Sequence, residues 1–169
     1  MMKKLIWLLL LLSLIACEQT QQTTTPISHQ ASKKYTQTMN LSGIVSNAQG
    51  RVKAGLVKVT NENQQIISTA EVNTHGQYEV SIPVNTDLPI LLNFEYESEH
   101  LLVVAIDPAI SKYDINPLTT KIAQKAKEMG GYTRANLVIA AENTVHVPDA
   151  NKTTTGFRGD PTTQYGGWH

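Results

Sequence analysis

The chain has 169 residues, with 14 basic and 14 acidic side chains and a formal net charge of zero. Its basic residues form no stripe or cluster, so nucleic acid is not expected as a partner. A single cysteine excludes a disulfide within the chain.

The N-terminus has the organisation of a secretory signal peptide over residues 1–16. Lys3 and Lys4 form a short basic segment, and residues 5–16 are apolar apart from Ser13. About 20 apolar residues are needed to cross a bilayer as a helix, so this run is too short for a membrane span. We therefore expect the segment to direct export.

The end of this segment, Leu14-Ile15-Ala16-Cys17, resembles the lipobox of bacterial lipoproteins. The resemblance implies cleavage before Cys17, a diacylglycerol on its thiol and, in many bacteria, a further acyl chain such as palmitate on its amino group. Each acyl methylene buried in a membrane contributes about 0.8 kcal/mol, so several chains hold a protein durably. Cys17 is thus the predicted lipid anchor of a cell-envelope protein.

Residues 17–38 are rich in Gln, Thr and Ser and carry no apolar period, so we expect a flexible tether. In lipoproteins of bacteria with two membranes, Asp after the lipidated cysteine commonly favours the inner membrane. Glu18 stands at that position here. This difference favours the outer membrane, at its periplasmic face or at the cell surface.

Apolar and polar residues alternate through residues 39–106, which is the period of β-strands. Residues 101–106 are apolar on both faces and are expected to form a central, buried strand. Asparagine begins each of three predicted turns, at residues 47–50, 61–64 and 73–76. Short strands at this spacing predict a mainly β protein with a small antiparallel β-sandwich. Six strands are expected, at residues 40–46, 56–61, 65–72, 77–83, 89–97 and 101–106.

Two stretches of this region, SGIVSNAQGRVKAGLVKVTN and TAEVNTHGQYEVSIP, resemble the carboxypeptidase regulatory-like domain. That family has a transthyretin-like (prealbumin-like) sandwich, which the resemblance implies for residues 39–106. The family usually has Ala-x-Val where this chain has Gly55-Leu56-Val57, and Asp in place of Asn73. The matching residues serve turns and packing and specify no chemistry. They are Gly43, Val45, Gly50, Gly55 and the run Thr74-His75-Gly76-Gln77-Tyr78.

Residues 107–148 are expected to be a helical extension that packs on the sandwich or covers one edge of a sheet. Pro108 ends the last strand, and Gly130 and Gly131 end the first helix. The first helix places Leu118, Ile122 and either Ala126 or Met129 on one stripe. The second, within residues 132–145, places Leu137, Val138 and Ala141 together.

Residues 149–169 have no hydrophobic period and are expected to be an irregular tail. Aromatic side chains in such a segment are either a strap laid across the domain or an exposed ligand for a partner. In the second case the candidate partner contacts are Phe157, Arg158, Tyr165 and Trp168.

The sequence carries no signature of catalysis. Its five histidines are scattered and lack the HxH, HxxxH or HExxH spacing of metal sites, and no nucleophile elbow or phosphate loop is present. Glu95, Glu97 and Glu99 alternate, which is typical of the solvated side of a strand. We therefore predict no catalytic residue, no metal and no cofactor.

These features predict a lipid-anchored envelope protein that is not an enzyme. We expect a binding or structural module that engages a protein or glycan partner. The alternative is an accessory subunit of an envelope enzyme, or a cryptic envelope hydrolase whose site is built from distant residues. The first hypothesis is favoured because the chain lacks the peptidase domain that regulatory-like modules accompany.

Overall fold

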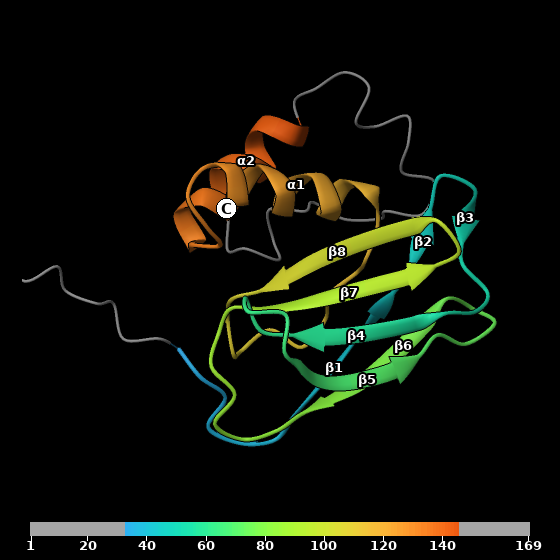
Figure 1. Ribbon diagram of the computed structural model, residues 1–169, viewed down its shortest axis with the longest axis horizontal. Helices are drawn as coiled ribbons and strands as arrows, with labels where there is room; N and C mark the ends of the chain where they lie inside the picture. Colours follow the sequence, from blue (N-terminus) through green and yellow to red (C-terminus); the bar gives the residue numbers. More distant parts are fainter. Residues whose placement is uncertain (1–32, 146–169) are drawn as a thin grey trace, which may run out of the picture. The chain divides into compact units, whose positions relative to one another are not determined.

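The computed structural model describes residues 33–145, which form eight strands followed by two helices (Figure 1). Antiparallel hydrogen bonding orders the strands as β5-β4-β7-β8 in one sheet, β1-β6 in a second and β2-β3 in a short hairpin. The strands are β1 (Met39–Ile44), β2 (Ser46–Asn47), β3 (Gly50–Arg51), β4 (Leu56–Thr60), β5 (Ile66–Glu71), β6 (Gln77–Ile82), β7 (Ile90–Tyr96) and β8 (Glu99–Ala105). The helices are α1 (Pro117–Glu128) and α2 (Arg134–Val145).

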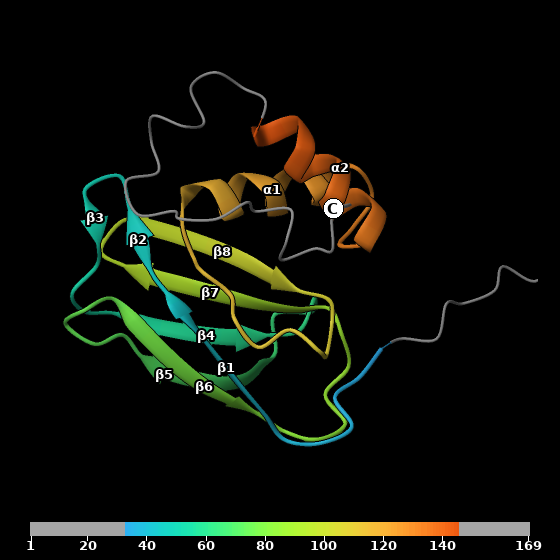
Figure 2. The ribbon, with the colours of Figure 1, turned by 180° about the vertical axis from the view of Figure 1, so that it is seen from behind.

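The four-stranded sheet and the β1–β6 pair enclose one hydrophobic core. Figure 2 shows β1 and β6 crossing in front of the four-stranded sheet as a second layer. Alternate side chains of each strand point into the space between the layers, as the two-residue period requires. The predicted mainly β fold, a small antiparallel sandwich followed by two short helices, is confirmed. Its core includes Leu41, Val57, Val59, Tyr78, Val80, Ile82, Ile90, Leu92, Phe94, Leu101, Val103 and Ala105.

Backbone conformation and packing both require glycine at position 55. Its φ of +137° belongs to a region that L-residues with side chains rarely adopt. A Cβ atom built on Gly55 would lie 2.3 Å from the ring of Phe94. Alanine at this position would therefore conflict both with the backbone and with a fully buried aromatic side chain.

A segment between β8 and α1 extends the β1–β6 layer, although no strand was predicted for it. The Ser42 N–H donates to the Ser111 carbonyl at 2.9 Å, and the Tyr113 N–H donates to the Ser42 carbonyl at 2.8 Å. Ile115 continues this parallel pairing, since its N–H donates to the Ile44 carbonyl at 2.9 Å. Figure 2 shows this segment running beside β1. The layer thus has three adjacent backbone segments.

The folded region begins before residue 39. The tether predicted for residues 17–38 therefore extends too far at its C-terminal end, because residues 33–38 belong to the described fold. Tyr35 is only 1% exposed and belongs to the core. Its N–H donates to the Thr86 carbonyl at 3.1 Å, and its own carbonyl accepts from the Asn85 N–H at 2.8 Å. One aromatic residue in a polar stretch gives no period, but its burial ties the segment to the sandwich.

The strand predicted at residues 101–106 is buried, as expected, but it does not lie at the centre of its sheet, so that part of the prediction is wrong. β8 lies at the edge of its sheet, and α1 lies over it (Figure 1). Leu101 and Val103 point into the sandwich, whereas Val104 joins a second apolar cluster with the helices. Thr120 of α1 also accepts from the Leu102 N–H at 2.9 Å, so the helix occupies the open edge of the strand.

Local chemistry fixes the start and the buried face of α1. The Asn116 side chain accepts from the N–H groups of Leu118 and Thr119, and Pro117 occupies the first helical position. The Thr119 hydroxyl in turn accepts from the Asn116 N–H at 3.0 Å, which completes a capping box. Leu118, Ile122 and Ala126 are buried, so the predicted stripe ends on Ala126 rather than on Met129. Within residues 33–145, neither helix is long and apolar enough to cross a bilayer.

Candidate functional site

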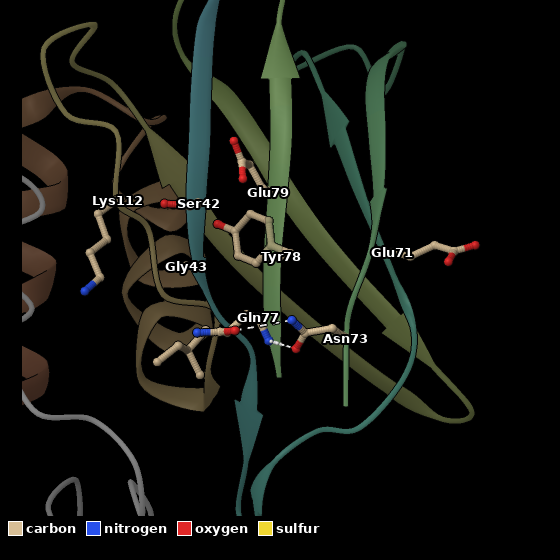
Figure 3. A pocket seen from close by; sticks show the side chains of 9 residues that line it. Ser42, Gly43, Glu71, Asn73, Gln77, Tyr78, Glu79 and Lys112 are labelled. Atoms are coloured by element: carbon tan, nitrogen blue, oxygen red, sulfur yellow. Dashed lines mark hydrogen bonds between the residues drawn. The ribbon is translucent and has the colours of Figure 1, made fainter. Parts of the chain in front are cut away.

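The outer surface of the β1–β6 layer carries an open depression of about 630 Å³ (Figure 3). Its walls come from β1, from β6, from the end of β5 with the following turn, and from the segment after β8. Most lining side chains are polar, and Ile44 supplies an apolar patch among them. The lining residues are Ser42, Gly43, Ile44, Glu71, Asn73, Gln77, Tyr78, Glu79 and Lys112.

Strand register brings the outward side chains of this surface together. Ser42 of β1 lies directly opposite Glu79 of β6, and Ile44 lies opposite Gln77. Lys112 pairs with Ser42 from the other side through an isolated parallel bridge. Lys112, Ser42 and Glu79 therefore form one row across three adjacent backbone segments.

Two asparagines hold the polar side chains of β6. The Asn73 side-chain amide donates to Gln77 Oε1 at 3.2 Å, and the Asn40 amide donates to Glu79 Oε1 at 3.2 Å. Figure 3 shows the Asn73–Gln77 contact at one end of the depression. With these oxygens engaged, the Gln77 amide nitrogen and the second Glu79 oxygen keep their hydrogen-bonding capacity for another group.

Asn73 also builds the turn that leads into β6. Its side-chain oxygen accepts from the N–H groups of His75 and Gln77, each at 2.9 Å. This Asx turn is a local arrangement that Asn and Asp both favour. Asn73 therefore does what Asp would do at this position, and its amide group additionally orients Gln77.

A buried tyrosine forms the floor beneath these side chains. The Tyr78 hydroxyl donates to the Tyr113 carbonyl at 2.5 Å, passing over Gly43, its partner in the strand register. Burial, together with the charge of Asp114 and the neighbouring Tyr113, raises the pKa of the Tyr78 hydroxyl well above its usual value. The hydroxyl stays neutral and serves as a structural donor.

Glycine at position 43 is required by this floor. A Cβ atom there would lie 1.9 Å from the Tyr113 carbonyl oxygen. No side chain fits between the two backbone segments at that distance. Gly43 thus allows β1, the 111–115 segment and the Tyr78 side chain to approach one another.

Two of the three charged residues of the depression, Lys112 and Glu71, lie on opposite sides of it. Figure 3 shows the side chains of Lys112 and Glu71 on opposite sides, extending away from each other. Among residues 33–145, neither side chain has a hydrogen bond or an ion pair. The central groups are the Ser42 hydroxyl, the Gln77 amide and the Glu79 carboxylate.

The three alternating glutamates do not form one carboxylate cluster. Glu95 lies in β7, one residue before its end, and forms an ion pair with Lys58 at 2.6 Å. The hydrogen bond within this pair lowers the pKa of the Glu95 carboxyl. Glu97 lies in the turn with a φ of 52°, and Glu99 begins β8. A hairpin therefore separates them, so the prediction of a single strand face is wrong.

No group of three or more His, Cys, Asp or Glu residues suited to a metal occurs in the described part of the chain.

The site residues predicted from the sequence lie outside the described residues. They are the lipid-anchor Cys17 and the tail residues Phe157, Arg158, Tyr165 and Trp168. The depression was not predicted from the sequence. Alternation in residues 77–82 already predicts that Gln77 and Glu79 point outward, but only the register places Ser42 and Ile44 opposite them.

Comparisons with protein-family models, with curated proteins and with solved structures give no match to the chain. The resemblances to bacterial lipoproteins and to the carboxypeptidase regulatory-like domain accordingly stay predictions from the sequence.

Proposed function

We propose that this chain is a lipid-anchored, non-catalytic binding module of the bacterial cell envelope. It holds an envelope protein or glycan on the outer surface of the β1–β6 layer. The observation that carries the proposal is the depression on that surface, where Ser42, Gln77 and Glu79 converge from two paired strands. Polar groups held by a rigid scaffold are the usual means by which a surface fixes the orientation of a ligand.

The proposed location rests on the N-terminal sequence. A basic start, a short apolar run and Cys17 in a lipobox-like motif support export followed by lipidation. Several acyl chains would supply a durable anchor without any basic surface patch. Glu18 supports the outer membrane as the destination, and a tether between Cys17 and Lys33 would let the folded region reach a partner.

Binding is favoured over catalysis by the way the groups at the depression are engaged. The Tyr78 hydroxyl, whose pKa is raised well above its usual value by burial, is committed to a backbone carbonyl. Glu79 and Gln77 are held by neighbouring amides, in an arrangement suited to stable recognition rather than to proton transfer.

Site-specific photo-crosslinking in intact cells tests this proposal. A photoreactive amino acid replaces Lys112, at the rim of the depression, in the full chain. The matched control replaces Lys127, an exposed lysine on α1. We expect a discrete adduct from position 112 and none of the same mass from position 127. Identical adducts from both positions, or none from either, would contradict a binding role for this surface.

A further inference from the structure

Four outward residues of β1 and β6 form a rectangle on the floor of the depression. Ser42 faces Glu79 and Ile44 faces Gln77 in the strand register. Opposite Cβ atoms of paired strands are about 5 Å apart, and residues two apart on one strand are about 7 Å apart. A single sugar ring with its hydroxyl groups covers an area of this size.

The corners of the rectangle offer both donors and acceptors. The Gln77 amide nitrogen donates, the free oxygen of Glu79 accepts, and the Ser42 hydroxyl does either. A sugar hydroxyl is likewise both a donor and an acceptor, so each corner can pair with one. Asn73 and Asn40 hold two of the corners in place, which lowers the entropy lost when a ligand binds.

Ile44 supplies the remaining corner with an apolar surface. Its side chain is half-buried and lines the depression between polar neighbours. The face of a sugar ring that carries C–H groups is apolar, so contact with Ile44 removes apolar surface from water. A surface with polar groups around one apolar contact is better suited to bind a sugar ring than to bind an extended apolar segment.

The charges around the depression disfavour anionic ligands. Glu71 and Glu79 line it, Asp114 lies beside Ile44 and accepts from its N–H at 2.9 Å, and Lys112 is the single cation among the lining residues. Like charges brought together reduce affinity for phosphate-rich or carboxylate-rich polymers. A neutral ligand avoids that repulsion.

We infer that the depression binds a neutral, hydroxyl-rich sugar ring of an envelope glycan, with Gln77 and Glu79 as direct hydrogen-bonding residues. This inference rests on the proposed binding function and names the class of its ligand. The ring contacts Ile44 with one face, while its hydroxyls bond to Ser42, Gln77 and Glu79.

Frontal affinity chromatography of the full chain in detergent tests the inference. The columns carry neutral trisaccharides of glucose, galactose, mannose or N-acetylglucosamine, and a parallel column carries a mixed-sequence peptide library. The variants are Gln77→Ala and Glu79→Gln, and Ser81→Ala is the matched control because Ser81 is an outward residue of the same strand outside the depression. Thermal unfolding followed by circular dichroism is measured for every variant, and each should keep the unfolding midpoint of the unmodified chain.

We expect at least one trisaccharide column to retain the chain, and each binding-site variant to bind about tenfold more weakly, since a lost hydrogen bond of about 1.4 kcal/mol corresponds to that factor. Ser81→Ala should bind like the unmodified chain. Equal retention of all variants would overturn the site. Retention only by peptides, weakened by Gln77→Ala and Glu79→Gln, would overturn the sugar class while leaving the proposed binding function intact. No retention on any column would overturn the sugar inference and would also count against the binding function.

Discussion

Replacement of Gly43 by Ala tests the packing on which the depression is built. The new Cβ atom would lie 1.9 Å from the Tyr113 carbonyl oxygen, whereas ordinary contact begins near 3.4 Å, so the two segments must separate by about 1.5 Å. That movement stretches the hydrogen bonds between Ser42 and residues 111 and 113, and the bond from the Tyr78 hydroxyl. Three hydrogen bonds at about 1 kcal/mol each, with about 1–3 kcal/mol of overpacking, give an expected loss of about 4–6 kcal/mol in unfolding free energy.

Urea unfolding followed by far-ultraviolet circular dichroism measures this loss on a chain that begins at Glu18. Ser42→Ala is the matched control, because it changes the neighbouring residue on the exposed side of the same strand and should alter stability by less than about 0.5 kcal/mol. A loss below about 1 kcal/mol for Gly43→Ala, with an unchanged dependence on urea, would refute the close approach of β1 and the 111–115 segment.

Three further predictions concern other parts of the chain. Tyr35→Phe should leave stability at pH 7 unchanged or slightly higher, because the buried hydroxyl has no hydrogen-bond partner among the described residues. Burial and the charge of Asp107 raise the pKa of Tyr35 from 10 to about 12. The contribution of this pKa difference to the unfolding free energy is therefore fully present below pH 10 and is lost as the pH rises through 12. At pH 11 the variant should therefore retain about 1 kcal/mol more of its neutral-pH stability than the unmodified chain, and equal alkaline losses in urea titrations would contradict this. Cys17→Ala should abolish incorporation of an alkyne fatty acid, and labelling equal to that of the unmodified chain would end the lipoprotein hypothesis. Deletion of residues 153–169 should lower the urea midpoint if the tail is a strap, whereas an unchanged midpoint with loss of a crosslinked partner would indicate a ligand.

Local signals in the sequence predicted much of the fold. Alternation in residues 77–82 gives the buried face of β6, because neighbouring side chains of a strand point to opposite sides. The asparagines at positions 61 and 73 start turns by accepting backbone N–H groups within four residues. Asn116 followed by Pro117 marks the start of α1 for an equally local reason.

Features that depend on distant pairing were not predictable in this way. The edge position of β8 follows from where the other strands pair, whereas its two apolar faces are equally suited to the centre of a sheet or to a helix-covered edge. Lys112 meets Ser42 although 70 residues separate them. The candidate site combines such contacts, and no short stretch of sequence contains it.

One face of β6 contributes to the stability of the core, and the other face contributes to the proposed binding site. Tyr78, Val80 and Ile82 point into the core, whereas Gln77 and Glu79 point into the depression. Substitutions of the outward residues should therefore change binding at nearly constant stability, since they remove little buried surface. Gly43 is different, because the segments that it brings together support both the core and the floor of the depression. A variant that separates those segments should reduce stability and binding together, which distinguishes a site built on the sheet from polar residues that are merely exposed on it.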